Sequence, residues 1–424
     1  MTHLKIIQGN NPSDTEEVGM EIINKLYELA VSGDLDQTSE LKGYLHLQVG
    51  DRAKMEYLTN MFPNKLFITA NNYLIPFEDQ NMVTYLNSIG VGSNGVITEA
   101  DAAAATIVAN SANTTVTKFN ELKYFTQITQ SKGGWTGTNE GAIQFYNWTA
   151  LEEVDISNFT SIGHSNGNAW KDTFHGCSAL KKVIASNKLL NIGFGAFKDC
   201  QNLEEITGLS GNILLFEDAF SNCQKLKNSS FINCSFSFVD NNSRYAFQNC
   251  KLLTSITIAS GETYIPQSTF NRCSALTTIN IPSSITHIGD TAFQSCTSLT
   301  SVDLSNVTSI GDSAFKNSGL SGIITLSECL TLGEGSFDNC SNITEIHAPK
   351  LANISIWNMW RGANLEVIDT PVADILRVDK CPKLTTINAP LATKFNPYVN
   401  GKLSLGGCPL LSTLNIDFSA VTEL

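Results

Sequence analysis

A phenylalanine that recurs about every 23 residues constrains this 424-residue chain more than any other feature. It stands at positions 174, 197, 220, 247, 270, 293, 315 and 337, usually after Ala or another small residue. A Cys follows three residues after nearly every Phe, at Cys177, Cys200, Cys223, Cys250, Cys273, Cys296 and Cys340, and Ser318 takes that place once. An aliphatic residue follows three residues after each Cys, with few exceptions. Because a unit of this length cannot bury its own apolar face, the units must stack on one another.

Each unit carries signals for local structure. Short alternating runs such as Ile256-Thr257-Ile258 predict a strand with one face buried. Asp, Ser or Thr after an Ile-Gly pair such as Ile288-Gly289 predicts the start of a helical turn, with the Ala-Phe on its inner side. Stacking aligns the strands in a parallel sheet. We therefore predict an α/β solenoid with parallel strands over residues 146–424, irregular after about residue 350.

The cysteines have two interpretations, redox or metal chemistry and simple burial. There are eleven, an odd number, and no C-x-x-C motif, which argues against a zinc ribbon and against a fully paired disulfide framework. Ser318 and Ala363 replace Cys in two units, so small size is sufficient at this position. Side chains in a parallel stack also point the same way, which places neighbouring thiols poorly for cross-linking. We expect a buried ladder, with no metal and no cofactor.

The repeat pattern I-x-x-I-G-x-x-A-F-x-x-C-x-x-L-x-x-I-x-I-P, which residues 286–302 follow closely, resembles the BspA-like branch of leucine-rich repeats. The resemblance covers roughly residues 150–424. It implies a leucine-rich repeat solenoid with a non-enzymatic surface or adhesion role, typical of gut and oral Bacteroidetes and of some protozoa. No catalytic residues come with that family.

A mixed α/β region precedes the repeats. Residues 1–35 contain a capping box, Ser13-Asp14-Thr15-Glu16, that opens a helix predicted to run from about 14 to 31. This helix either attaches the chain to a partner or packs within its own domain. Residues 36–80 predict a strand–helix–strand cap module.

Residues 81–145 combine a degenerate EF-hand-like helical segment with a lead-in to the repeats. Gly95 and Ile97 fit the turn and core positions of a calcium loop. Gly90 and Gly92, however, stand where the ion requires carboxylates. We predict a loop that keeps the fold without the ion.

Charge and hydropathy exclude two classes of partner. The net charge of −13, without any run of five Lys or Arg, argues against nucleic-acid binding. No apolar stretch approaches the roughly 20 residues of a membrane span. The first ten residues contain no apolar core of a signal peptide.

No catalytic constellation is visible either. The six histidines lie far apart, without ligand spacing, and the sequence contains no nucleophile-elbow, zinc-protease or phosphate-loop motif. We predict that the chain is not an enzyme.

Departures from the repeat period mark candidate contact sites, because insertions map to loops on one face. They are the insertion at 164–170, the 27-residue step that carries 230–242, and the irregular end beyond 350. The candidate partner-binding residues there are His164, Trp170, Phe236, Phe238, Trp357, Arg361 and Tyr398. Repeat decay toward a terminal cap is the competing interpretation. Residues 414–418 predict a last strand, whose uncovered edge implies either self-association as a homo-oligomer or a short cap.

Three functions remain open from the sequence. The chain could be an adhesin that binds a host surface protein or glycan at the extracellular surface. It could be a virion fibre or decoration protein of a phage infecting Bacteroidetes, attached to other virion proteins through its N-terminal region. An intracellular structural scaffold is the third possibility.

Overall fold

The computed structural model describes residues 24–33, 49–51, 54, 57, 60, 72–93, 95–105, 113–126, 145–163, 173–227, 234–236, 244–351, 364–372, 381–391 and 408–417. The chain forms two compact units. One comprises Met1–Val108 with Val116–Ile128, and the other comprises Ala109–Thr115 with Thr129–Leu424.

The N-terminal unit mixes helices and short strands. Residues 24–31 are helical, which confirms the end of the helix predicted from 14 to 31; its first part lies outside the described residues. Strands β1 (Val49–Asp51) and β2 (Asn72–Leu74) pair in parallel. They are followed by helix α3 (Gln80–Ser88), helix α4 (Glu99–Ala104), strand β3 (Lys118–Phe119) and the 3-10 helix η1 (Asn120–Tyr124). Phe119 joins its aromatic core, 6.2 Å from Phe77 and 5.5 Å from Phe125 between ring centroids.

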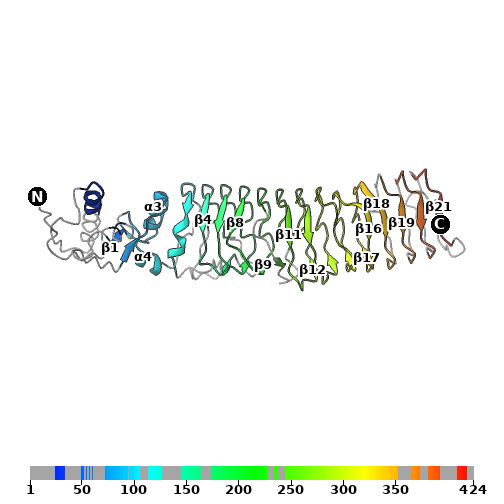
Figure 1. Ribbon diagram of the computed structural model, residues 1–424, viewed down its shortest axis with the longest axis horizontal. Coiled ribbons are helices and arrows are strands. Elements are labelled where there is room, and N and C mark those ends of the chain that lie inside the picture. The colour runs from blue at the N-terminus through cyan, green and yellow to red at the C-terminus, as the bar shows by residue number, and fades with distance from the viewer. Residues whose placement is uncertain are drawn as a thin grey trace, which may run out of the picture. The chain divides into compact units, whose positions relative to one another are not determined.

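The second unit is a solenoid with two series of parallel strands, stacked along one axis (Figure 1). The first series comprises β4 (Glu153–Asp155), β6 (Lys182–Ile184), β8 (Glu205–Thr207), β11 (Ser255–Thr257), β13 (Thr278–Asn280), β16 (Ser321–Thr325), β18 (Asn342–His347), β19 (Val367–Asp369), β20 (Thr386–Asn388) and β21 (Thr413–Asn415). The second comprises β5 (Ser161–Ile162), β7 (Asn191–Ile192), β9 (Ile213–Leu215), β10 (Cys234–Phe236), β12 (Tyr264–Ile265), β14 (His287–Ile288), β15 (Ser309–Ile310) and β17 (Thr331–Leu332). The predicted parallel solenoid of about 23 residues per turn is confirmed, whereas the second series was not predicted.

The first series is interrupted beside β16. Residues 301–304 alternate like a strand but form no ladder with β13 or β16. Strand β16 contains Gly322, and a register shift in its pairing with the next strand, β18, falls between Gly322 and Ile323.

Nine phenylalanines form a continuous stack in the interior. Rings from Phe145 to Phe337 lie 4.9–5.7 Å apart between centroids, with interplanar angles of 3–13°. The spacing follows the inter-turn distance, so each ring covers its neighbour in an offset arrangement. Phe145 lies one turn before Phe174, the first Phe of the sequence repeat.

The segment around each Phe is not the predicted helical turn. Backbone N–H groups of alternate residues donate to the next turn, as from Thr291 to Asp312, Phe293 to Ala314 and Ser295 to Lys316, at 2.7–2.8 Å. Residues two before and two after the Phe take left-handed backbone, at φ +54° for Thr291 and +61° for Ser295. The second of these positions holds Asn147, Gly176, Asp199, Asn222, Asn249, Arg272, Ser295, Asn317 and Asn339. Asn, Asp and Gly tolerate this conformation best, so the dipeptides Asn-Cys and Asp-Cys were the signal that sequence reasoning missed.

All eleven cysteines are buried, as predicted for a ladder of small apolar residues. They have a further role, because most of the ladder thiols donate to a backbone carbonyl of the preceding turn. Cys273 Sγ lies 3.1 Å from the Phe247 carbonyl oxygen, which also accepts the Cys250 N–H at 3.1 Å. Burial raises the pKa of Cys273 to about 12, so the thiol stays protonated as this donor requires.

Candidate binding surface

The outward side chains of the first strand series form an ordered polar surface of the solenoid. We call this surface, from β11 to β21, the strand face. Buried and partly exposed residues alternate along its strands, as in a sheet with one side on the core. The middle residues of β11, β19 and β20 are buried, and their flanking residues are partly exposed. Ser, Thr and Asn dominate it, and the charged side chains of these strands and of residues 301–303 are Asp303, Glu345, His347 and Asp369.

Hydrogen bonds between turns hold many of these side chains. Thr277 Oγ1 donates to the Thr254 carbonyl at 3.1 Å, and Ser321 Oγ donates to the Thr300 carbonyl at 3.3 Å. Each bond fixes a rotamer that would otherwise be free on the surface. The strand face is therefore ordered before any partner arrives.

A chain of amides runs along the C-terminal strands. Asn415 Nδ2 donates to Asn388 Oδ1 at 2.6 Å, and Asn388 Nδ2 donates to Asp369 Oδ1 at 2.6 Å. The other oxygen of Asp369 lies 3.3 Å from His347 Nδ1, and His347 Nε2 lies 2.8 Å from Glu345 Oε2. The hydrogen bond to Glu345 is the largest effect and raises the pKa of His347; burial opposes it, and the hydrogen bond to Asp369 adds to the rise.

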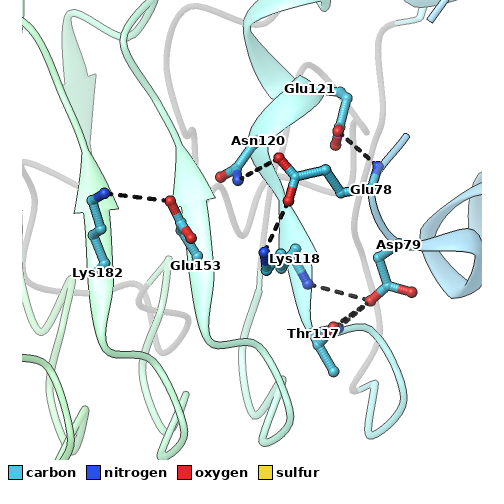
Figure 2. A network of polar contacts seen from close by, with 8 residues as sticks. All are labelled: Glu78, Asp79, Thr117, Lys118, Asn120, Glu121, Glu153 and Lys182. Atoms are coloured by element: carbon cyan, nitrogen blue, oxygen red, sulfur yellow. Dashed lines mark hydrogen bonds and ion pairs between the residues drawn. The ribbon is translucent and has the colours of Figure 1, made fainter. Parts of the chain in front are cut away.

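The first strands of the solenoid carry a different pattern, in which opposite charges alternate from turn to turn. Lys181 Nζ lies 2.9 Å from Glu152, and Lys227 Nζ lies 2.8 Å from Glu204. Figure 2 shows a third pair, Lys182 and Glu153, at 3.6 Å across β6 and β4. All three pairs are at least partly exposed, so they fix register more than they add stability. The strand face proper contains no Lys or Arg at its described strand positions.

A second His–Asp–Asn–Asn chain lies on the turn segments that flank the Phe stack. Asn249 Nδ2 donates to Asn222 Oδ1 at 2.6 Å, and Asn222 Nδ2 donates to Asp199 Oδ1 at 2.6 Å. Asp199 Oδ2 lies 3.3 Å from His175 Nε2. Three of these residues occupy left-handed positions, so the same amides serve both the backbone conformation and the inter-turn contact.

The N-terminal unit contains a separate polar network, drawn in Figure 2. Asp79 caps α3 by accepting the Asn81 N–H at 2.9 Å, and its other oxygen accepts the Thr117 hydroxyl at 2.7 Å. Burial alone would raise the pKa of Asp79, yet hydrogen bonds from Thr117, Asn81 and Lys118 together lower it.

Glu121 is the buried member of the same network. Its Oε1 accepts the Glu78 N–H at 3.0 Å, whereas its Oε2 is buried without a hydrogen-bond partner. Burial is the largest effect and raises the pKa of Glu121. The network connects the start of α3 to η1, and we interpret its role as structural.

The EF-hand-like loop is closed by an amide. Asn87 Nδ2 donates to the carbonyls of Val91 and Val96 at 3.0 and 3.3 Å, and Asn87 Oδ1 accepts the Gly95 N–H at 2.8 Å. The carboxylate of Asp101 bonds Thr98 in the capping box of α4. The polar side chains of Asn87 and Asp101 are thus hydrogen-bonded to other groups of the protein.

Most residues predicted as contacts lie outside the described residues: His164, Trp170, Phe238, Trp357, Arg361 and Tyr398. Phe236 is described, and the prediction is wrong for it. Its side chain is 1% exposed and packs edge-on against Phe270 at 6.4 Å between centroids. The strand β10 turns it inward, because the insertion supplies one more rung of the second series.

Within the parts of the chain that the structure describes, no three His, Cys, Asp or Glu side chains gather in a group that could hold a metal ion. No helix found there is long and apolar enough to cross a bilayer.

Comparison with known proteins places the repeats in a family. The model of the BspA type leucine rich repeat region matches in six copies, over residues 108–227, 138–274, 227–344 and 263–373. No curated protein sequence matches the chain significantly.

Several solved structures of leucine-rich repeat proteins are similar to this chain at low identity. A leucine rich cell surface protein from Faecalibacterium prausnitzii is 18% identical, with 74% of this chain and 93% of that chain covered and a TM-score of 0.33. A leucine-rich repeat protein from Bacteroides ovatus is 15% identical, with 68% and 82% covered and a TM-score of 0.35. The pneumococcal vaccine antigen PcpA is 14% identical, with 66% and 86% covered and a TM-score of 0.35. The family model, which spans more than half of the chain, carries the assignment: this chain belongs to the BspA-type leucine-rich repeat family.

Proposed function

We propose that the chain is a non-enzymatic recognition protein that binds a protein partner at the extracellular surface through the strand face. The observation that carries the proposal is the pre-ordering of this surface, in which side chains of successive turns are hydrogen-bonded before any ligand is present. Side chains that are already fixed lose little conformational entropy on association, so the surface is suited to a specific contact.

The charge of the strand face indicates the chemistry of the partner. Its acceptors include Asp303, Glu345 and Asp369, with Glu366 directly before β19, while Lys and Arg are missing from the strand positions that the structure describes between β11 and β21. A partner rich in hydrogen-bond donors and positive charge complements such a surface. The ion-paired strands before β11 present a balanced pattern and contribute less to this preference.

Two further considerations support a binding role over catalysis. The repeat family brings no catalytic residues, and the cysteine thiols described in the solenoid are buried in its core. A thiol whose pKa burial has raised to about 12, as in Cys273, is a poor nucleophile at neutral pH. No observation favours a virion fibre or an intracellular scaffold, and we do not extend the proposal to either.

A matched pair of charge reversals tests the proposal. Glu366→Arg changes an exposed position beside β19 on the strand face, and Glu334→Arg changes an exposed position on the turn segments. The purified chain and both variants are measured against immobilised fibronectin, laminin and collagen and against a glycan array. We expect binding to at least one protein, weakened roughly fivefold or more by Glu366→Arg and unchanged by Glu334→Arg.

The contrary outcomes are equally clear. An equal loss of binding in both variants would show that the contact depends on the general charge of the chain, and it would exclude the strand face as the binding site. Binding confined to glycans would replace the proposed protein partner with a carbohydrate. Absence of binding to both panels, with both variants folded, would overturn this choice of partners.

A further inference from the structure

His347 occupies an unusual place on the strand face, because both of its ring nitrogens face carboxylates. Nε2 lies 2.8 Å from Glu345 on the same strand, and Nδ1 lies 3.3 Å from Asp369 on the next strand, β19. A neutral imidazole has one N–H and can donate to one of them only. Satisfying both contacts requires the doubly protonated ring.

Among the residues that the structure describes, the other elements around the ring add no competing charge. Strand β16 places the uncharged Thr325 opposite His347 in the register, and β19 places Asp369 there on the other side. The loops that follow β16 and β18 carry Glu328 and Lys350, which neutralise one another at 2.6 Å. The state of the ring is thus set by Glu345 and Asp369.

We infer that His347 is a pH-responsive latch that ties β18 to β19 in its protonated form and orders the C-terminal part of the strand face. The contact of Nδ1 with Asp369 is the longer of the two, so the proton is lost there, and a ring lone pair then faces the Asp369 carboxylate and replaces an attraction by a repulsion. The two strands are then held at this point by their backbone ladder alone.

Asp369 transmits the effect along the sheet. It is the terminal acceptor of the amide chain from Asn415 through Asn388. When the His347 contact is lost, the Asp369 carboxylate can reorient, and the two amides that depend on its position lose their common anchor. The latch therefore controls the order of three successive turns of the strand face.

The direction of the pH effect follows from the raised pKa of His347, which the hydrogen bond to Glu345 mainly causes. A histidine whose pKa is higher in the folded than in the unfolded chain contributes stability that is complete below the unfolded value of about 6.5. That contribution is lost as pH rises through the folded pKa. The C-terminal strands are thus most ordered in mildly acidic conditions, and the consequence for partner binding rests on the proposed function.

Histidine titration and amide exchange test the latch in the full-length chain without any partner. Histidine-selective 13C labelling gives the titration of each ring, and the signal lost in His347→Gln assigns His347. Hydrogen exchange is then followed by mass spectrometry in peptides covering β18–β20 at pH 5.5 and 8.0, corrected for intrinsic exchange. We expect protection in the wild type to be roughly three- to tenfold lower at pH 8.0 than at pH 5.5.

Two variants make the result specific. His347→Gln should show the same low protection at both pH values. The control is His287→Gln on β14, because His287 contacts the Thr286 hydroxyl at 2.7 Å and no carboxylate among the described residues. This control should behave as the wild type does.

The latch is overturned if wild-type protection over β18–β20 does not change with pH, or if His347→Gln retains the wild-type change. A His347 titration midpoint at or below the ordinary histidine value of about 6.5 would overturn it independently. Since no partner takes part, a failed binding panel would leave these results intact.

Discussion

Asn222 donates its side-chain amide to Asp199 Oδ1 at 2.6 Å, one turn back along the solenoid, while its own backbone lies in the left-handed region at φ +66°. The same side chain accepts amide hydrogens from Asn249 at 2.6 Å and Gln224 at 2.9 Å. One residue thus meets a backbone requirement within its turn and a hydrogen-bonding requirement between turns.

These two roles can be separated with two substitutions at Asn222. Asn222→Gly removes the three side-chain hydrogen bonds but tolerates the positive φ, whereas Asn222→Ala removes the bonds and also strains the backbone. We expect Asn222→Ala to lower the free energy of unfolding by about 1–2 kcal/mol more than Asn222→Gly. Urea unfolding of the two variants measures the difference. Equal losses would show that the left-handed conformation costs nothing at this position.

Arg272 occupies the equivalent left-handed position two turns later, at φ +63°, where most turns have Asn, Asp or Gly. Its side chain is exposed. Arg272→Asn should therefore stabilise the chain by about 0.5–1 kcal/mol. The exposed Lys188 has no positive φ, so Lys188→Asn serves as the control and should show no gain in a thermal melt. A loss of stability in Arg272→Asn would contradict the backbone explanation.

Thr370 is a buried hydroxyl without a hydrogen-bond partner, in the column that holds Ala348 and Ala389 in neighbouring turns. Removing a buried polar group that makes no hydrogen bond recovers its desolvation cost. Thr370→Val keeps the shape and should raise the free energy of unfolding by about 1 kcal/mol. The fully buried Thr269 donates to the Pro266 carbonyl at 2.7 Å, so Thr269→Val should instead destabilise the chain. Opposite signs in thermal melts are the expected outcome, and destabilisation by both would show that the Thr370 hydroxyl has a partner.

The cysteine ladder should be chemically silent while the chain is folded. Every cysteine is buried, and burial raises the pKa of Cys177, Cys234 and Cys273 to about 12, so almost no thiolate forms at pH 8. We expect a disulfide-exchange reagent such as DTNB to label no thiol at pH 8 in the native chain and all eleven after denaturation. Rapid labelling of a native thiol would show that the solenoid opens locally.

Glu121 should make the N-terminal unit less stable as pH rises. Burial raises its pKa, so folding favours the protonated carboxyl, and this contribution is fully present below the unfolded value of about 4.3 and is lost as pH rises through the folded pKa. Glu121→Gln cannot ionise. The difference in melting temperature, variant minus wild type, should therefore increase between pH 4 and pH 7. A constant difference over that range would mean that Glu121 does not change its protonation state there.

Much of the fold could be predicted from the sequence because its period is strong. The recurrence of Phe and Cys every 22–27 residues requires stacking, and stacking places equal positions of successive turns in contact. The Phe stack, the buried cysteines and the parallel strands at 255–257 and 278–280 follow from that rule alone.

The candidate surface could be predicted only in part. Loops that depart from the period were the natural candidates, yet Phe236 proved to be a core residue because its insertion adds a strand rather than a loop. The ordered strand face carries no exceptional residue in the sequence, since Ser, Thr and Asn are frequent throughout. Its order arises from contacts between turns.

What the sequence determined by itself is the repeat, its core and the parallel direction of the strands, because these depend on which residue types recur and not on their orientation. Tertiary structure decided the left-handed turns around each Phe, the break at 301–304, and the meeting of His347 with Asp369 across 22 residues of chain. The physical reason is register. Shifting one strand by a single residue reverses the direction of its side chains, and the register of each turn is set by backbone hydrogen bonds to its neighbours.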